Sequence, residues 1–239
     1  MPILGLTATV TEVVKQDIIA RLGIQGCYFF QSSFNRPNLY YEVRDKTKNI
    51  IEDIESIIRK YSQQSGIIYC LAKRECEEMS ASLNRRGHRT AFYHADINEG
   101  DKKATQDQWM HNHINIIIAT VAFGMGINKP DVRFVIHHSM SKSLENYYQE
   151  SGRAGRDGQF SECILFYRKA DKQFLQSMNL QNDFSTLERK EFSTKQLAQM
   201  IKYCEDHSTC RRQFQLHYLG EIDFDPKICK KTCDNCRKG

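Results

Sequence analysis

Long apolar runs and targeting signals are absent from this 239-residue sequence. Apolar stretches such as Ile114–Thr120 and Phe134–Ile136 are short and bounded by polar residues, whereas a membrane-spanning helix needs about 20 apolar residues. The first nine residues hold no basic region and no extended apolar stretch before a small-residue cleavage site, so they do not resemble a secretory signal. We therefore expect an intracellular protein with no membrane partner.

A self-sufficient nucleotide-hydrolysing site is also missing. No G-x-x-x-x-G-K-S/T segment occurs, since Gly124 and Lys129 stand at the wrong spacing, and neither D-E-x-H nor D-E-x-D is present. Such segments supply the backbone cradle, the phosphate lysine and the magnesium carboxylate of many ATP-hydrolysing proteins. The chain alone is therefore expected not to hydrolyse ATP.

Neither charge sign dominates the composition. The net charge of +5 allows polyanion binding without requiring it, because only clustered charge makes an electrostatic footprint. Hydrophobic residues make up 40% and charged residues 26%, which excludes a disordered chain and provides for a buried core. At roughly 100 to 200 residues per domain, the length suits one large domain or a medium domain with a small one.

Cysteine is unevenly placed, with five of the nine in the last 36 residues. An odd total without a secretion signal argues against a disulfide framework. The last four, spaced x18, x3 and x2, are Cys210, Cys229, Cys233 and Cys236. Four thiolates favour a structural, tetrahedral zinc ion, with an iron–sulfur cluster or free buried thiols as alternatives. Cys204 fits the apolar face of a helix, and His207 or His217 as a replacement ligand ranks below Cys210.

Between residues 39 and 167 apolar segments alternate with helical ones. Strands are predicted at 39–43, 66–71, 90–94, 114–120, 132–137 and 163–167, and helices at 47–62, 73–86, 98–112 and 143–151. This alternation predicts an α/β fold with an open, mostly parallel sheet. Ligands of such sheets gather at the carboxyl ends of the strands, where we expect Thr120, His138 and the glycine-rich loop 152–158.

The two ends of the chain differ from this pattern. A helix is predicted over residues 11–22, and residues 1–34 are interpreted as the tail of another domain, with a hinge around Pro37. Residues 35–169 form the α/β lobe, and 170–239 a small helical zinc-binding subdomain. Within the latter, Ser193 and Gln196 fit a capping box, and a further helix is expected over 209–219.

Two arginines stand three residues apart in the stretch Gln149–Gly158. Small residues around Arg153 and Arg156 let both guanidinium groups point to one side, where their forks suit phosphate oxygens. A solvated turn is the alternative interpretation of such Gly/Arg clusters. A second glycine-containing loop, Ala119–Asp131, follows a buried strand and favours the phosphate site.

Together these two stretches resemble motifs V and VI of superfamily 2 helicases and, in detail, the RecQ family of DNA helicases. Supporting matches are Leu6–Thr9 with motif III, Phe34–Leu39 with the RecQ inter-lobe linker, Ile67–Leu71 with motif IV, Tyr93–Ala95 with the segment after it, and Cys210–Arg212 plus Cys233–Cys236 with the zinc subdomain. The resemblance covers almost the whole chain. It implies a second RecA-like lobe with a zinc subdomain, and a missing first lobe that holds most of the ATP and Mg²⁺ in the complete motor.

Individual roles follow from the resemblance. Arg156 matches the arginine finger on the γ-phosphate, with Arg153 and Gln149 beside it, and Gly126 and Asn128 match further nucleotide contacts. Asn128 stands where aspartate is usual, so it carries no charge but can still bond a ribose hydroxyl or pair with Arg153.

The resemblance also implies contacts with DNA. Thr120 and the backbone after Gly66 match positions that hold the DNA backbone, whereas Thr7 and Thr9 match those that couple hydrolysis to lobe movement. Two residues at a predicted helix start, Lys73 and Arg74, are candidates for phosphate contacts, with a solvated helix end as an equal alternative.

The implied activity is ATP-driven 3′ to 5′ unwinding of DNA, with single-stranded DNA and duplex junctions as partners, in repair, recombination and replication. A nuclear location follows only from the DNA substrate. The alternative is a non-catalytic, zinc-stabilised nucleic-acid-binding or regulatory module. An RNA helicase of the same superfamily is disfavoured by the cysteine set.

Overall fold

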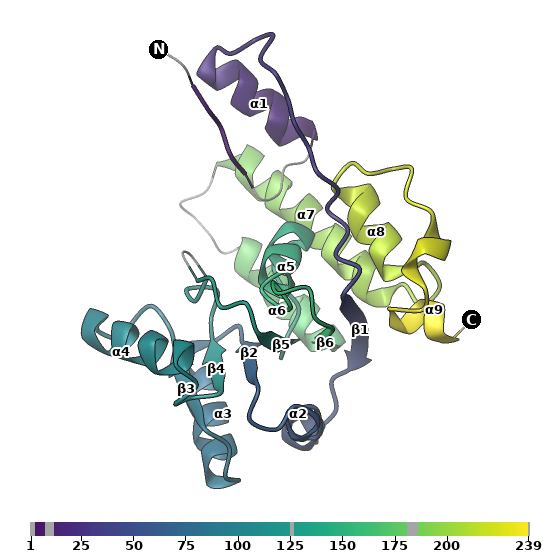
Figure 1. The fold of residues 1–239 in the computed structure, drawn as a ribbon. Helices are drawn as coiled ribbons and strands as arrows, with labels where there is room; N and C mark the ends of the chain where they lie inside the picture. Colours follow the sequence, from purple (N-terminus) through teal and green to yellow (C-terminus); the bar gives the residue numbers. More distant parts are fainter. Residues whose placement is uncertain (1–2, 8–11, 125–126, 181–185, 239) are drawn as a thin grey trace.

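The computed structural model describes residues 3–7, 12–124, 127–180 and 186–238 (Figure 1). Its centre is one parallel sheet in the order β1-β6-β5-β2-β4-β3. The strands are β1 (Leu39–Asp45), β2 (Ser65–Tyr69), β3 (Thr90–Tyr93), β4 (Ile116–Ala119), β5 (Val132–His137) and β6 (Ser161–Tyr167). All the strands predicted from the alternation of apolar segments are confirmed, with shifts of a few residues at their ends.

Helices cover both faces of this sheet. They are α2 (Ile50–Lys60), α3 (Lys73–Arg85), α4 (Glu99–Met110), α5 (Leu144–Ser151) and α6 (Lys169–Leu180). One buried cluster joins α2 and α3 to one sheet face through side chains such as Ile54, Met79 and Phe134. The other face packs against α5 and α6, as with Tyr147 and Leu175. Because both faces are covered, the central strands are apolar on both sides.

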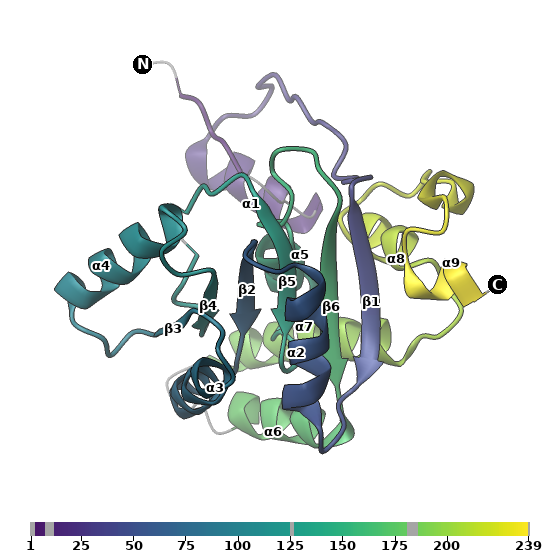
Figure 2. The same ribbon diagram turned by 60° about the horizontal axis from the view of Figure 1, so that its bottom comes forward.

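The last elements extend the core beyond the sheet. They are α7 (Leu187–Glu205), α8 (Arg211–Tyr218), a 3₁₀ turn at Pro226–Cys229, and α9 (Asp234–Lys238). Buried α7 side chains, among them Leu197, Met200 and Tyr203, belong to the same apolar cluster as strand residues of the sheet. Figure 2 shows α8 and α9 beside β1, at the edge of the sheet. The apolar core therefore continues from the α/β lobe into the cysteine-containing segment.

Backbone hydrogen bonds tie this segment to the edge strand. The Tyr41 amide donates to the Thr232 carbonyl at 3.2 Å, and the Val43 amide donates to Asp234 Oδ2, also at 3.2 Å. An exposed edge strand is a template for unwanted pairing with other chains. The cysteine segment lies along that edge and supplies hydrogen-bond acceptors to two backbone amides of β1.

One helix begins earlier than its capping pattern predicts. Thr186 caps α7 by accepting a hydrogen bond from the Arg189 amide at 3.3 Å, so the prediction of a cap at Ser193 is wrong. Ser193 lies inside the helix, and its hydroxyl donates to the Lys190 carbonyl at 3.0 Å. Within a helix, a serine hydroxyl can donate to a backbone carbonyl of the preceding turn. A serine therefore marks a helix start only when no residue before it already caps the helix. The helix expected over 209–219 is confirmed as α8.

The amino-terminal segment stands apart from the sheet (Figure 1). Its helix α1 (Glu12–Leu22) and residues 3–7 line a pocket of about 210 Å³, yet Leu4 and Leu6 remain 82% and 87% exposed. No helix in the described part of the chain is both long and apolar enough to cross a membrane.

Candidate arginine site and cysteine metal centre

The loop that carries the two arginines lies at the amino ends of the strands. Its Gly155 amide donates to the carbonyl of Val132, the first residue of β5, at 2.8 Å. The expectation of a position at the carboxyl ends is therefore wrong for this loop, because α5 returns from the end of β5 and delivers the loop to the start of β6. Gly155 has a φ of +54°, and a Cβ there would lie 2.5 Å from Asn38 Nδ2, so glycine is required.

Each arginine is bonded to the loop between β4 and β5. Arg156 Nη1 donates to the Ile127 carbonyl at 2.6 Å and to Asn128 Oδ1 at 3.0 Å. Arg153 Nη1 donates to the Gly124 carbonyl at 2.5 Å. The suggested pairing of Asn128 with Arg153 is thus corrected, since Asn128 and its neighbouring carbonyl both bind Arg156. The two stretches singled out in the sequence are brought together, as the resemblance implies.

Positive charge is concentrated at this site. Burial, and then the neighbouring Arg153 and Arg36 guanidinium groups, lower the pKa of Arg156. Arg153 Nε is buried without a hydrogen-bond partner among the residues that the structure describes. An unsatisfied buried donor costs about 1–3 kcal/mol, so a rearrangement of the site that brings an acceptor to it would be favoured. The arrangement can attract and orient an anion such as a phosphate.

Glycine gives the guanidinium group room at this point. A Cβ on Gly124 would lie 2.5 Å from Arg153 Nη2. Gln149 is exposed on the last turn of α5, one turn before Arg153. Gly126 lies outside the described residues, and so does Thr9, whereas Thr7 is exposed in the amino-terminal segment.

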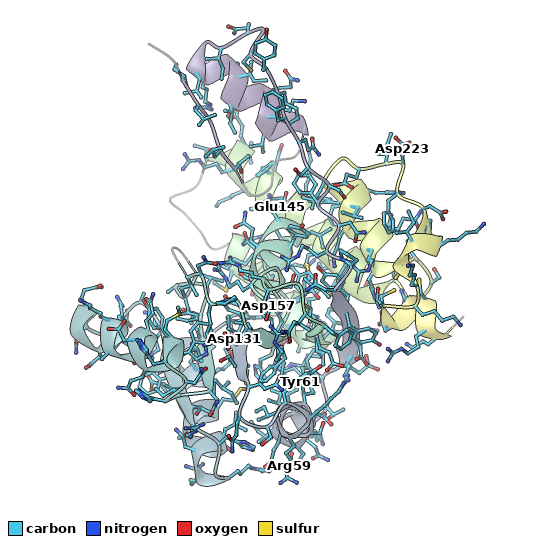
Figure 3. All side chains as sticks on the ribbon, in the orientation of Figure 1. Arg59, Tyr61, Asp131, Glu145, Asp157 and Asp223 are labelled. Carbon is cyan, nitrogen blue, oxygen red and sulfur yellow. The ribbon has the colours of Figure 1, made fainter. Side chains whose placement is uncertain are left out.

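Acidic residues frame the loop. Asp131 and Asp157, both labelled in Figure 3, are each held by a basic partner. Asp157 accepts from Arg133 at 2.6 and 2.8 Å, and this ion pair lowers the pKa of the Asp157 carboxyl. Asp131 lies 3.1 Å from the ammonium group of the buried Lys129. The Arg133–Asp157 pair ties the arginine loop to β5, the Lys129–Asp131 pair lies within loop 120–131, and neither pair neutralises Arg153 or Arg156.

The proposed DNA-contacting threonine lies at the opposite end of the sheet. Thr120 directly follows β4, and its amide donates to the Tyr93 carbonyl at 3.2 Å. It lines a cavity of about 80 Å³ whose wall includes His137, Ser141 and Glu150. Within that wall Glu150 Oε2 accepts from Ser141 at 2.7 Å and lies 2.8 Å from His137 Nε2. Loop 120–131 thus begins at the carboxyl ends of the strands and ends near the arginines at their amino ends.

Two other expectations for DNA contacts change. The backbone that follows Gly66 belongs to β2, which pairs with β4 on one side and β5 on the other, so its peptide groups are used in the sheet. Lys73 and Arg74 are exposed, and each is paired with a carboxylate, Asp96 at 2.5 Å and Glu78 at 2.6 Å. These ion pairs favour the interpretation of a solvated helix start.

The four carboxyl-terminal cysteines converge, because Cys210, Cys229, Cys233 and Cys236 place their Sγ atoms within 4.8 Å of one another. Lys230 and Lys231 turn the chain between them through left-handed φ angles of 49° and 59°. Neighbouring sulfurs and burial raise the pKa of Cys210, and burial is the main cause that raises the pKa of Cys236 to about 12. Hydrogen bonds from Cys210 and then Cys233 lower the pKa of Cys229. A divalent metal would stabilise the thiolate form of the whole set.

Four cysteine sulfurs gathered this closely fit a structural zinc ion, which takes four such ligands in tetrahedral geometry. Cys204 is packed in the core, where burial raises its pKa, as expected from its helix face. Neither His207 nor His217 joins the sulfur cluster in the described part of the chain.

Two arginines next to Cys210 connect the cysteines to the lobe, and the sequence reasoning assigned them no contacts. Arg211, 1% exposed, binds Asp234 through Nε at 2.8 Å and Nη2 at 3.0 Å. Arg212 donates from Nε to Thr232 Oγ1 at 2.9 Å and from Nη1 to the Arg36 carbonyl at 2.6 Å. The sequence signal for these roles was the presence of the C-R-R and C-D-N-C motifs.

Comparisons with known proteins agree with this geometry. The family model described as helicase conserved C-terminal domain matches residues 48–158, and the one described as RecQ zinc-binding matches residues 169–237. The ATP-dependent DNA helicase Q-like 4B of Arabidopsis thaliana is 48% identical over 99% of this chain and 22% of its own length. The ATP-dependent DNA helicase Q1 of Pongo abelii is 46% identical over 99% of this chain and 36% of its own length.

The chain thus spans roughly a fifth to a third of these curated relatives. Among solved structures, S. cerevisiae Dbp5 bound to RNA and ADP BeF3 shares the fold, with a TM-score of 0.59 and 18% identity over 80% of this chain and 54% of that chain. With its helicase carboxyl-terminal lobe and its RecQ zinc-binding segment, the chain belongs to the RecQ family of helicases.

Proposed function

We propose that this chain is the carboxyl-terminal part of the motor of an ATP-dependent 3′ to 5′ DNA helicase. The observation that carries the proposal is the paired attachment of Arg153 and Arg156 to loop 120–131, beside an unsatisfied buried Arg153 Nε. Residues 1–34 would be the tail of the first RecA-like lobe, residues 35–169 the second lobe, and residues 170–239 the zinc subdomain.

In this function Arg156 acts as the arginine finger. ATP and Mg²⁺ would be held mainly by a first RecA-like lobe, which would face the amino ends of these strands. Arg156 would meet the charge that develops on the γ-phosphate during phosphoryl transfer, a contribution worth about 10³ to 10⁵ in rate in related NTPases. Arg153 and Gln149 would flank the phosphate, and Gly126 and Asn128 would lie near the nucleotide.

Zinc would be held by Cys210, Cys229, Cys233 and Cys236 as a structural ion. The closed set of four thiolates supports this role, because a catalytic zinc keeps one position for water or substrate. The ion would supply folding free energy at the sheet edge, where the cysteine segment contacts β1.

DNA would run along the carboxyl ends of the strands, near Thr120. Loop 120–131 supports a coupling of DNA binding to ATP hydrolysis, since one end of the loop carries Thr120 and the other end binds Arg156. Single-stranded DNA and duplex junctions are the proposed substrates, and nuclear residence follows from them. Phosphate contacts predict that affinity falls steeply with salt, by counterion release.

The test is Arg156→Ala in a full-length protein that carries this chain after an ATP-binding lobe. DNA-stimulated ATP hydrolysis should fall by about 10³-fold or more, while DNA affinity stays within about twofold. Arg59→Ala is the matched control, because Arg59 lies on the solvent side of α2, away from the arginine loop (Figure 3). A wild-type protein that binds DNA without ATP hydrolysis would support the non-catalytic module instead.

A further inference from the structure

A third arginine holds the loop that carries Arg153 and Arg156. The Arg36 guanidinium donates to the carbonyls of Gly152 at 3.3 Å, Ala154 at 3.1 Å and Gly155 at 2.8 Å. Helix ends leave carbonyl groups without intrahelical partners, and a positive charge there is favourable. Arg36 therefore closes the end of α5 at the point where the chain turns into the arginine loop.

The other side of Arg36 is held by the cysteine segment. Its carbonyl accepts from Arg212 Nη1 at 2.6 Å, and Arg212 is only 2% exposed. The same guanidinium donates to Thr232 Oγ1 at 2.9 Å, one residue before Cys233, and to Asn35 Oδ1 at 3.1 Å. A continuous set of hydrogen bonds thus joins the metal centre, the linker and the arginine loop.

We propose that Arg36 is a positioning residue for ATP hydrolysis, which sets the place of Arg156 and connects it to the docking of the zinc subdomain. This inference rests on the proposed function of Arg156. Arg36 itself touches only backbone carbonyls of the loop, so it acts through the loop and not on the nucleotide.

Arg36 is not part of the apolar core that holds α5, and this separates positioning from stability. Arg36 is half-buried, whereas α5 is anchored by the fully buried Leu144 and Tyr147. Removal of the guanidinium takes one donor from each of three carbonyls beside Arg153 and Arg156 while the core contacts persist. Of the three, the Gly155 carbonyl keeps hydrogen bonds from Asn38 Nδ2 and the Gly158 amide. A displacement of about 1 Å at a reacting group can cost about 100-fold in rate.

The expected signature is a fall in kcat without a matching change in KM. In the full-length protein, Arg36→Met should lower the kcat of DNA-stimulated ATP hydrolysis by about 10- to 100-fold, because a finger acts in the transition state. KM for ATP should stay within about threefold. Arg36→Lys should recover only part of kcat, since an ammonium group cannot reproduce a planar fork that reaches three carbonyls.

Arg44→Met is the matched control. Arg44 lies on the adjoining strand β1 and is similarly half-exposed, and within the described part of the chain its guanidinium donates to Glu42 through Nε and Nη2, both at 2.8 Å. It should leave kcat within about twofold of the wild type. Hydrogen exchange of peptides covering residues 150–158 should quicken in Arg36→Met and not in Arg44→Met.

Specific outcomes overturn the proposal. A stable Arg36→Met protein with wild-type kcat and unchanged exchange in residues 150–158 would do so, as would equal losses of kcat in Arg44→Met. If Arg36→Met does not fold, Asn38→Ala serves, because Asn38 Nδ2 donates to the Gly155 carbonyl at 2.8 Å from the same linker. A smaller fall in kcat, about 3- to 10-fold, is expected there, and no fall would refute the positioning role.

The same experiment separates this inference from the proposed function. If the wild type hydrolyses ATP and Arg156→Ala does not, the function stands and Arg36→Met tests positioning alone. If neither the wild type nor Arg156→Ala hydrolyses ATP, the proposed function fails, and hydrogen exchange in residues 150–158 still reports whether Arg36 orders the loop.

Discussion

The metal centre and the arginine loop differ in how much of each site the chain contains. All four sulfurs of the metal centre come from residues 210–236 and converge within one short segment. The arginine loop offers donors to an anion, but the lysine and carboxylate that complete a phosphoryl-transfer site are absent from the sequence. A complete metal site contributes to the folding of this chain. The arginine loop contributes to phosphoryl transfer only when the lysine and carboxylate that complete that site are present. Substitutions in the two regions should therefore change different observables.

The sharpest test of this difference is the loss of one metal ligand. Cys233→Ser should remove the zinc ion and unfold the cysteine segment, because structural zinc binding is worth about 10 to 16 kcal/mol in small peptides. Mass spectrometry of the purified wild-type chain should find about one zinc per chain, and the variant should have lost it. Cys27→Ser is the control, since Cys27 is exposed and outside the sulfur cluster. Full zinc content in Cys233→Ser would refute the assigned ligand set.

A buried ion pair tests how firmly the metal segment holds the lobe. Asp234→Asn leaves the Arg211 guanidinium, 1% exposed, without its carboxylate partner. Breaking a buried pair in this way costs about 3–5 kcal/mol. Chemical denaturation should show that loss in the free energy of unfolding, while zinc content remains at the wild-type level. A variant as stable as the wild type would mean that the Arg211–Asp234 pair adds nothing to the Tyr41–Thr232 hydrogen bond and the apolar contacts that hold β1.

The sequence predicted the strands and the cysteine set well because both depend on local patterns. A run such as Ile116–Ala119 is apolar on both faces, and this reflects burial inside a parallel sheet. The C-x2-C spacing of Cys233 and Cys236 lets two thiols reach one ion from a single tight turn, and Cys229 stands only four residues before Cys233. Neither prediction needed contacts between residues far apart in the chain.

Two of the predictions that failed required such contacts, and the third was decided by competition between two local caps. The end of the sheet at which the arginine loop lies depends on the direction of α5. That direction is set by the chain path, which leads from the end of β5 back to the start of β6. The bonds from Arg36 to residues 152–155 span more than a hundred positions, so the linker motif indicated a hinge and not an anchor. Ser193 matched a cap locally, but Thr186 begins the helix first.

A buried histidine gives a pH test of the lobe that is independent of both sites. Burial and then Lys46 lower the pKa of His138 to about 3, from an ordinary value near 6.5. The unfolded chain therefore takes up a proton below about pH 6.5 while the folded lobe does not, so stability falls as pH decreases from about 6.5 towards 3. Asp171 partly offsets the effect of Lys46, and Arg168 adds to it.

The predicted loss from His138 is about 1 to 2 kcal/mol between pH 7 and pH 5. The free energy of unfolding should be measured for the wild type and for His138→Gln across that range. Subtraction of the two curves cancels proton uptake by the cysteines, which both proteins share. Parallel curves would contradict the buried, neutral state of His138.

The smallest effect is expected from the two basic residues at the start of α3. Lys73 and Arg74 already bind Asp96 and Glu78, and exposed ion pairs of this kind contribute little to stability. The double variant Lys73→Ala, Arg74→Ala should therefore retain DNA affinity within about twofold and the same slope of log affinity against log salt, because no phosphate contact is lost. Thr120→Val is the informative partner, since its position at the carboxyl edge predicts weaker DNA binding without loss of stability. A double variant with a shallower salt slope would show that these two side chains leave their carboxylates to bind phosphates, and would extend the DNA path from Thr120 to α3.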